Sequence, residues 1–256
     1  MNQILVTKKL YVTPELKRKK KIYKFNFFLS IFLVIILVSL YIYAEYDRNK
    51  NEELSQELLA NAEAQEDTTI YPKDILVAVL NDTTGEATQK ANEQQLAQIN
   101  DEAIKAIKQN EVYTTNDGFQ YTIDAKIYIP AIGIEYPILL GKTGSEAETD
   151  ALLKISPTKF HGYDANGVGN YCIVGHNYRN TKFFSKVPTL KNGDIIELTN
   201  MSTKSKINYV VYDKYIVDPN DRDCTSQLTN GKKEITLITC TDDSKQRYII
   251  KATEIK

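Results

Sequence analysis

Residues 25–44, "FNFFLSIFLVIILVSLYIYA", form a run of twenty residues without a charged side chain. As an α-helix such a run spans roughly 30 Å, the thickness of the hydrocarbon core of a bilayer. A buried core helix would keep a polar face, which this run lacks. A cleavable signal peptide would be shorter and followed by a small-x-small site, but "YIYAEYDRNK" offers only Ala44. The run therefore predicts one transmembrane helix that is not removed.

The charges before this run indicate its orientation. Residues 1–24 contain eight lysines and arginines against one glutamate. Because lysine and arginine collect on the cytoplasmic side of a membrane helix, we expect residues 1–24 in the cytoplasm and the residues after 45 outside the membrane. The net charge of the whole chain is −1, which gives no sign of a nucleic-acid partner.

Residues 45–118 differ in composition from residues 119–256. "NEELSQELLANAEAQED" and "ATQKANEQQLAQINDEAIKAIKQNE" are rich in helix formers, but their apolar positions make only a thin stripe without a sustained heptad. The turn-forming residues "NDTTGEAT" separate the two pieces. We predict a solvated helical stalk over residues 45–118 that holds a folded domain away from the membrane. Whether the stalk pairs as a coiled coil stays open.

Residues 119–256 follow a β pattern. Short strands at regular spacing are typical of a closed or sandwich-like β domain. One helix is expected in "SEAETDALLKIS", with Ser145 as its N-cap and Glu148 three residues later. The apolar, β-branched runs that predict strands are "AKIYIPAIGIEYPILLG" (two strands), "NYCIVGHN", "GDIIELTN", "KINYVVYDKYIV", "EITLITC" and "RYIIKATEI".

Three reactive side chains stand at the ends of predicted strands. Cys240 ends "EITLITC", Arg247 begins "RYIIKATEI" and His176 follows "NYCIV". The six residues "TDDSKQ" would turn the chain back and set the guanidinium beside the thiol. A free cysteine, with a pKa of about 8.5, needs a neighbouring cation or base to react, and the oxyanion on an attacked carbonyl needs a donor. Cys240, His176 and Arg247 are therefore candidates for one catalytic site.

Each of these residues also has an ordinary structural explanation. Taken alone, a strand cysteine is most often a buried thiol, a loop histidine a hydrogen-bonded one and an arginine a surface residue. The sequence has no C-x-x-C or H-x-x-x-H spacing, so no metal site is expected. Because the domain is expected outside the cytoplasm, a disulfide between Cys172 and Cys224 that leaves Cys240 unpaired also stays open.

A family resemblance rests on these same residues. "TLITC" at residues 236–240, Arg247 on the next predicted strand and "GHN" at residues 175–177 together resemble the signature of the sortases. Sortases are membrane-anchored cysteine transpeptidases of Gram-positive bacterial surfaces, which agrees with the predicted anchor. The resemblance covers residues 127–256, about half of the chain, and also takes in "GVGNYCIVGHN", "FFSKVPTLKNGDIIEL", "YIVDPND" and "ATEI".

The resemblance implies a mainly β fold, an eight-stranded β-barrel with short helices, preceded by the transmembrane helix and the stalk. It also implies a groove for an LPxTG-like sorting signal at the C terminus of a surface protein. Cys240 would attack the carbonyl of the Thr–Gly bond to form a thioester, and an amine of a peptidoglycan precursor would resolve it. Arg247 would hold the substrate and oxyanion, and His176 would exchange protons with the two amines. No cofactor is implied.

The resemblance assigns further residues less directly. Thr239, beside the thiol, is expected to help shape the substrate-binding site. His161 matches a histidine that some sortases carry away from the catalytic centre, so we leave it out of the site. Some relatives bind Ca²⁺ near a loop in which Asp218, Asp221 and Asp223 would offer oxygen ligands, but acids in a turn are usually solvated and no metal is assigned.

The sequence lacks motifs that are typical of pilin-polymerising sortases and of L,D-transpeptidase-like enzymes. Residues 45–120 contain no Asp-Pro-aromatic lid motif of the pilin-polymerising sortases, and no second apolar run follows the barrel. We therefore expect an anchoring sortase of class A or D. Two alternatives stay open. An L,D-transpeptidase-like enzyme usually has His-Gly before its cysteine and an arginine two residues after it, unlike Cys240 and Arg247. An inactive, membrane-tethered binding domain would tolerate loss of all three candidate residues.

Overall fold

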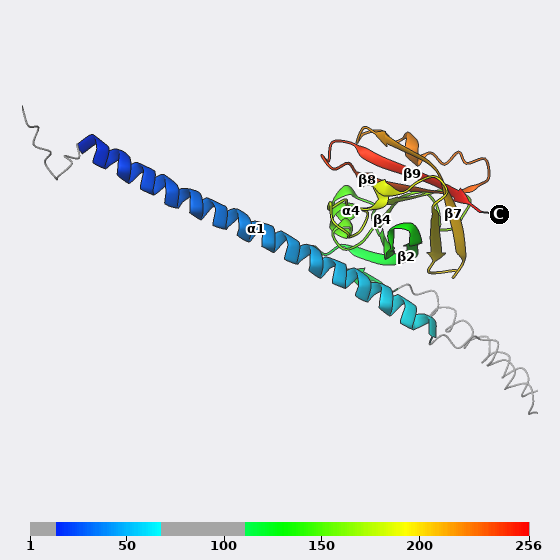
Figure 1. The fold of residues 1–256 in the computed structure, drawn as a ribbon. Coiled ribbons are helices and arrows are strands. Elements are labelled where there is room, and N and C mark those ends of the chain that lie inside the picture. The colour runs from blue at the N-terminus through cyan, green and yellow to red at the C-terminus, as the bar shows by residue number, and fades with distance from the viewer. Residues whose placement is uncertain (1–13, 68–110, 256) are drawn as a thin grey trace, which may run out of the picture. The chain divides into compact units, whose positions relative to one another are not determined.

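The structure, a computed structural model, describes residues 14–67 and 111–255 (Figure 1). The chain divides into two compact units, residues 1–49 and residues 50–256, and each is described by itself. The helices are α1 (Pro14–Asp67), α4 (Glu146–Leu153) and the 3-10 helices η1 (Pro130–Ile132), η2 (Val187–Thr189) and η3 (Asp223–Thr225). The strands are β1 (Tyr113–Thr114), β2 (Gln120–Ile129), β3 (Ile134–Gly141), β4 (Thr158–His161), β5 (Gly169–Val174), β6 (Ile195–Asn200), β7 (Lys206–Val217), β8 (Lys233–Cys240) and β9 (Arg247–Glu254).

The described part of the first unit, residues 14–49, belongs to α1 and is helical throughout. The most apolar 18-residue window of this helix has a mean hydropathy of 2.6, and none of it is buried. A helix of this length and composition can cross a bilayer. The structure is therefore consistent with the membrane anchor predicted over residues 25–44.

The second unit contains a closed β-barrel. The strands are ordered β1-β2-β3-β4-β5-β8-β9-β7-β6, and β2 also pairs with β6. This extra pairing closes β2 to β9 into a ring of eight strands, while the two-residue β1 pairs with the start of β2. Most neighbours are antiparallel, but β3–β4 and β5–β8 run parallel. The expected mainly β fold with an eight-stranded barrel is confirmed.

The barrel interior is filled by alternate residues of its strands. In β2 the burial of the side chains alternates residue by residue over nearly the whole strand, as a strand with one face on a core requires. Burying apolar surface in this way contributes roughly 25 cal/mol per Å² to the stability of the fold. The interior cluster includes Ile127, Ile129, Tyr171, Ile173, Ile196, Leu198, Tyr209, Ile235, Leu237 and Ile250.

Helix α4 begins at the predicted cap. The Ser145 hydroxyl accepts a hydrogen bond from the backbone N–H of Glu148 at 3.2 Å. The Glu148 carboxylate does not complete a capping box with Ser145. It instead accepts hydrogen bonds from the backbone N–H groups of Lys142, Thr143 and Gly144 at 2.7–3.2 Å. The carboxylate thereby holds the loop between β3 and α4 in place.

The part of α1 that belongs to the second unit, residues 50–67, is not fully solvated. Leu58 and Ala62 lie in a buried cluster with barrel residues that include Tyr121 and Leu139. The Ser55 hydroxyl donates a hydrogen bond to the Ser156 hydroxyl at 2.9 Å. These contacts differ from the solvated stalk that the composition predicted for this stretch. The second predicted helical piece of the stalk falls within residues 68–110, outside the described residues.

Candidate active site

The parallel pairing of β5 and β8 brings two of the candidate residues to one edge of the barrel. Val174, the last residue of β5, pairs with Ile238 of β8. His176 lies two residues beyond Val174, and Cys240 lies two residues beyond Ile238. Because parallel strands end in the same direction, the chain passes through His176 and Cys240 at the same edge.

Strand β9 adds the third candidate residue. Arg247, its first residue, pairs directly with Cys240 across the antiparallel β8–β9 ladder. The predicted six-residue turn between them is closed by a hydrogen bond from the Thr241 N–H to the Gln246 carbonyl at 3.0 Å. Side chains of directly opposed residues lie on the same face of a sheet. The register therefore places the side chains of Cys240 and Arg247 on the same face of neighbouring strands.

The side chain of Cys240 points away from the barrel interior. Ile235, Leu237 and Thr239 are 0%, 0% and 1% exposed, and the first two belong to the interior cluster. Since successive residues of a strand point to opposite faces, Cys240 lies with Ile238 on the outer face. Cys240 is partly exposed. The thiol is therefore not enclosed in the barrel.

Three hydrogen bonds join the chain around His176 to the chain around Cys240. The Gly175 N–H donates to the Ile238 carbonyl at 3.1 Å. The Thr239 hydroxyl donates to the Gly175 carbonyl at 2.8 Å, and the Asn177 side-chain amide donates to the Cys240 carbonyl at 3.0 Å. Both residues that flank His176 are thus bonded to the end of β8.

Two of these residues bear on the sequence-based expectations. Thr239 is 1% exposed and its hydroxyl donates to the Gly175 carbonyl, so its side chain links two strands. Its expected part in shaping the substrate-binding site stays a prediction. Asn177 was not predicted as a site residue. Its place directly after His176 in "GHN" is the only signal that the sequence gives.

His176 is fixed by the segment that comes after it. Its carbonyl accepts a hydrogen bond from the Phe184 N–H at 3.1 Å, and its ring lies against the Tyr178 ring with centroids 4.9 Å apart. A Cβ atom on Gly175 would lie 2.5 Å from the Phe184 ring, a separation that side chains do not tolerate. The close approach of Phe184 explains why glycine precedes the histidine.

Arg247 is held near Cys240 by the turn that joins the two strands. Its Nη1 donates to the carbonyls of Gln246 and Ser244 at 3.1 and 3.4 Å. These bonds use one nitrogen of a group that carries five N–H donors. Arg247 as a whole is partly exposed.

The part of the chain that contains these three residues matches a known family model. The model of the sortase domain matches residues 127–255, just over half of the chain, and the matched part contains Cys240, His176 and Arg247. The chain belongs to the sortase family. Because the family consists of transpeptidases, the domain is that of a sortase transpeptidase.

Solved sortase structures are among those similar to this chain. A sortase D5 transpeptidase of Clostridium perfringens is 30% identical, with 53% of this chain and 80% of that chain covered and a TM-score of 0.46. Sortase C-1 of Actinomyces oris is 23% identical, with 52% and 73% covered and a TM-score of 0.44. Sortase A of Listeria monocytogenes is 23% identical, with 52% and 88% covered and a TM-score of 0.44. A search of curated proteins gave no match. These names span three classes and do not confirm the expected preference for class A or D.

The other two cysteines of this sortase lie in a different environment from Cys240. Cys172 and Cys224 are buried in one apolar cluster with Ile238 and Ile249, and both are free thiols, so the disulfide that the sequence left open is not formed. Burial raises the pKa of Cys172 to about 12 and also raises the pKa of Cys224. Buried thiols of raised pKa are poor nucleophiles. Cys240, by contrast, is partly exposed.

The segment between β7 and β8 is bonded to the outer face of the barrel beside this cluster. The carbonyl of Cys224, in η3, accepts hydrogen bonds from Asn170 Nδ2 at 3.0 Å, Thr236 Oγ1 at 3.3 Å and Lys251 Nζ at 3.3 Å. The three donors come from β5, β8 and β9 in turn. They anchor the segment on the same face of the sheet as the Cys240 thiol.

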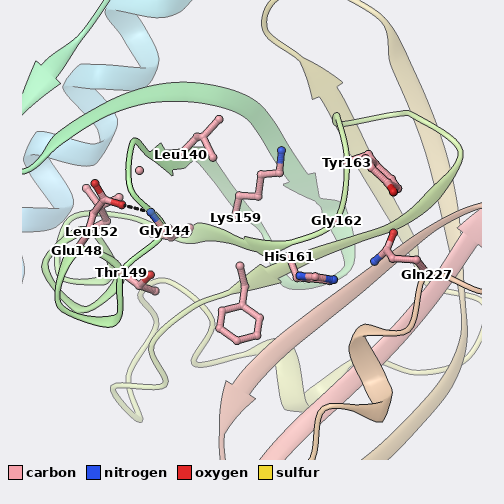
Figure 2. A pocket seen from close by; sticks show the side chains of 13 residues that line it. Leu140, Gly144, Glu148, Thr149, Leu152, Lys159, His161, Gly162, Tyr163 and Gln227 are labelled. Atoms are coloured by element: carbon pink, nitrogen blue, oxygen red, sulfur yellow. Dashed lines mark hydrogen bonds between the residues drawn. The ribbon is translucent and has the colours of Figure 1, made fainter.

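A pocket of about 340 Å³ lies in a different part of the sortase domain (Figure 2). Residues of α4 and β4 line it together with Gln227, and Figure 2 shows His161 in its wall. The dashed line in the figure is the hydrogen bond from the Gly144 N–H to Glu148. None of the three candidate catalytic residues lines this pocket.

The described residues offer no evident metal site. Within residues 14–67 and 111–255, no group of three or more His, Cys, Asp and Glu side chains could hold a metal ion. The carboxylates of Asp218 and Asp221 accept backbone N–H groups of Asn220 and Asp223 at 3.0 and 2.8 Å. These acids stabilise turns of the chain.

Proposed function

We propose that this sortase cleaves an LPxTG-like sorting signal between Thr and Gly and joins the new C terminus of the surface protein to an amine of the peptidoglycan. The observation that carries the proposal is the position of Cys240. It stands on the outer face of the barrel, directly opposite Arg247, and its carbonyl is bonded to the residue directly after His176.

In the first half of the reaction, the Cys240 thiolate attacks the carbonyl carbon of the Thr–Gly bond. A C–S bond forms, and negative charge develops on the carbonyl oxygen. When the C–N bond then breaks, the electron pair goes to the glycine nitrogen, which takes a proton from the His176 imidazolium and leaves as an amine. The surface protein stays on the enzyme as a thioester.

The second half reverses these steps with a different amine. The amine of a peptidoglycan precursor attacks the thioester carbonyl, and His176 takes its proton. A C–N bond forms, the C–S bond breaks and Cys240 returns as a thiolate. An imidazole suits both halves because its ordinary pKa lies near neutrality, so it gives and takes a proton with similar ease.

Arg247 would stabilise the charge that develops on the carbonyl oxygen. A charged guanidinium beside the attacked carbon lowers the energy of the tetrahedral species more than that of the flat substrate. Its two present bonds are made by Nη1 to carbonyls of the preceding turn. Nε and Nη2 would then donate to the substrate, while the Nη1 bonds keep the guanidinium oriented.

The N-terminal helix supports a location at the cell surface. We place residues 25–44 in the membrane, residues 1–24 in the cytoplasm and the sortase domain outside, since the basic residues precede the apolar run. The partners are then surface proteins that carry a sorting signal and a peptidoglycan precursor. The missing Asp-Pro-aromatic motif in residues 45–120 favours an anchoring enzyme of class A or D.

A transfer assay tests the proposal. The full chain in detergent micelles is mixed with a fluorescent LPETG peptide and triglycine, and the products are identified by mass spectrometry. We expect a peptide cut after Thr and ligated to triglycine. Cys240→Ala, His176→Ala and Arg247→Ala should lose this product, whereas Cys172→Ala and Cys224→Ala should keep it. An unmodified peptide with the intact chain, or a product with Cys240→Ala, would refute the proposal.

A further inference from the structure

The NH₂ group and the oxygen of the Asn177 side-chain amide both form hydrogen bonds. Its Nδ2 donates to the carbonyl of Cys240 at 3.0 Å and to Oδ1 of Asp242 at 3.1 Å. Its Oδ1 accepts the backbone N–H of Arg179 at 2.9 Å. Both N–H donors and the carbonyl oxygen of the amide are therefore engaged.

These partners allow only one orientation of the amide. If the amide were rotated by half a turn, Oδ1 would face the Cys240 carbonyl and the Asp242 carboxylate, which are both acceptors. The NH₂ group would then face the N–H of Arg179. All three bonds would be lost together, and an unpaired polar group in a partly buried place is costly. The side chain is thus locked as a donor to the carbonyl of Cys240.

The backbone at Asn177 is fixed as well. Asn177 forms an isolated antiparallel bridge with Phe183, whose neighbour Phe184 donates to the His176 carbonyl. The loop after His176 therefore folds back on Asn177. A movement of the Asn177 side chain would be transmitted to the adjacent His176, because both belong to this short closed loop.

We propose that Asn177 is a positioning residue that sets the separation between the Cys240 thiol and the His176 imidazole. The inference rests on the proposed function and adds a residue to it. Asn177 and Thr239 act as a reciprocal pair. Thr239, just before the thiol, bonds the residue just before the imidazole, and Asn177, just after the imidazole, bonds the residue that carries the thiol.

The two side-chain links lie on opposite sides of His176. The Thr239 bond is buried and lies on the side of the barrel interior, whereas Asn177 is partly exposed. The Thr239–Gly175 and Gly175–Ile238 bonds hold the chain just before the imidazole. The Asn177 bond holds the chain just after the imidazole to the residue that carries the thiol.

The test compares four variants of the full chain in detergent micelles. Asn177→Ala removes the amide. Asn177→Asp keeps the size of the side chain and the hydrogen bond from the Arg179 N–H. It replaces the NH₂ group, which donates to Cys240 and Asp242, with an oxygen that can only accept. Asp242→Asn is the matched control, because its side-chain oxygen still accepts from Asn177. The double variant Asn177→Asp with Asp242→Asn restores a bond between positions 177 and 242 but not the bond to Cys240.

The transfer assay measures kcat and KM for the LPETG peptide. A misplacement of about 1 Å between reacting groups reduces the rate by about 100-fold, so we expect kcat to fall by about 10- to 100-fold in both single Asn177 variants. KM should stay within about twofold, because no substrate contact is removed. The double variant should stay as slow as Asn177→Asp, and Asp242→Asn should stay close to the unchanged chain. Thermal unfolding followed by circular dichroism corrects each rate for the folded fraction.

A second readout needs no sorting signal. The rate of alkylation of Cys240 by iodoacetamide, followed by mass spectrometry, reports on the surroundings of the thiol, and we expect it to fall at least about threefold in Asn177→Ala. If the unchanged chain does not process the peptide, the proposed function fails, while this rate still tests Asn177. Unchanged kcat and unchanged alkylation in Asn177→Ala would overturn the inference. A loss in Asp242→Asn as large as that in Asn177→Asp would also overturn it.

Discussion

The hydroxyl of Thr239 lies 2.8 Å from the carbonyl oxygen of Gly175, and these two residues directly precede Cys240 and His176. The bond joins neighbouring parallel strands at the point where both end. The bond connects the last threonine of "TLITC" to the glycine of "GHN". The two motifs lie far apart in the sequence, but they form a single hydrogen-bonded unit in the fold.

Replacing Thr239 by valine tests the contribution of this bond. Valine keeps the volume of the side chain but leaves the buried Gly175 carbonyl without its donor, so we expect the free energy of unfolding to fall by about 1–3 kcal/mol. Thr239→Ser keeps a hydroxyl and should lose less. Urea unfolding followed by circular dichroism measures both. A valine variant as stable as the unchanged chain would show that the bond is not needed.

The guanidinium of Arg247 should not be replaceable by an ammonium. Lysine keeps the charge but lacks the planar fork that donates to the turn and to an oxyanion at once. We expect Arg247→Lys to lower kcat of the transfer reaction by about 100-fold, the usual loss for one oxyanion donor. Arg48→Lys, at an arginine that is ion-paired with Glu45 in α1, serves as the control and should leave kcat unchanged.

Residues 50–67 should contribute to the stability of the second unit. Leu58 is 3% exposed in a cluster with barrel residues, whereas Leu54 is 37% exposed. We expect Leu58→Ala to reduce the free energy of unfolding by about 2–5 kcal/mol. Leu54→Ala should change it by about 0.5 kcal/mol or less, as surface substitutions do. Equal effects of the two substitutions in urea unfolding would contradict the packing of this helix.

The buried thiol of Cys172 should make the fold less stable in alkali. Burial raises its pKa well above that of a free cysteine, to about 12. Between these values the unfolded chain loses the proton and the folded chain keeps it. The stabilisation is therefore complete below about pH 9 and is lost as the pH rises towards 12. Cys172→Ala should show a smaller decrease in the free energy of unfolding between pH 8 and 11, measured with urea; an unchanged slope would contradict the raised pKa.

The elements of the barrel could largely be predicted because most strands are apolar, β-branched runs with clear turns between them. Strand β4 was missed. It has four residues, "TKFH", and a register shift between Lys159 and His161 breaks the alternation that marks a strand. Residues 50–67 were expected to be solvated because their apolar positions are few. Leu58 and Ala62 nevertheless pack against barrel residues that lie far away in the sequence, so a local pattern does not reveal these contacts.

The candidate site was predictable where strand ends carry reactive groups. Cys240 and Arg247 are separated by a turn, so their pairing follows from a local hairpin. The position of His176 at the same edge of the barrel as Cys240 depends on the parallel pairing of β5 and β8, which no local pattern reveals. Asn177 was missed for the same reason. An amide does not titrate, and its hydrogen bond is to a carbonyl 63 residues away in the sequence.

The most direct measurement is the mass of the acyl-enzyme. The full chain is incubated with an LPETG peptide without an amine acceptor, quenched in acid and digested for peptide mapping. We expect the mass of the peptide up to Thr to be added to Cys240 alone, to disappear with hydroxylamine, and to be absent from Cys172, Cys224 and the Cys240→Ala variant. An adduct on another residue, or cleavage of the peptide with Cys240 replaced, would contradict the assignment of Cys240 as the nucleophile.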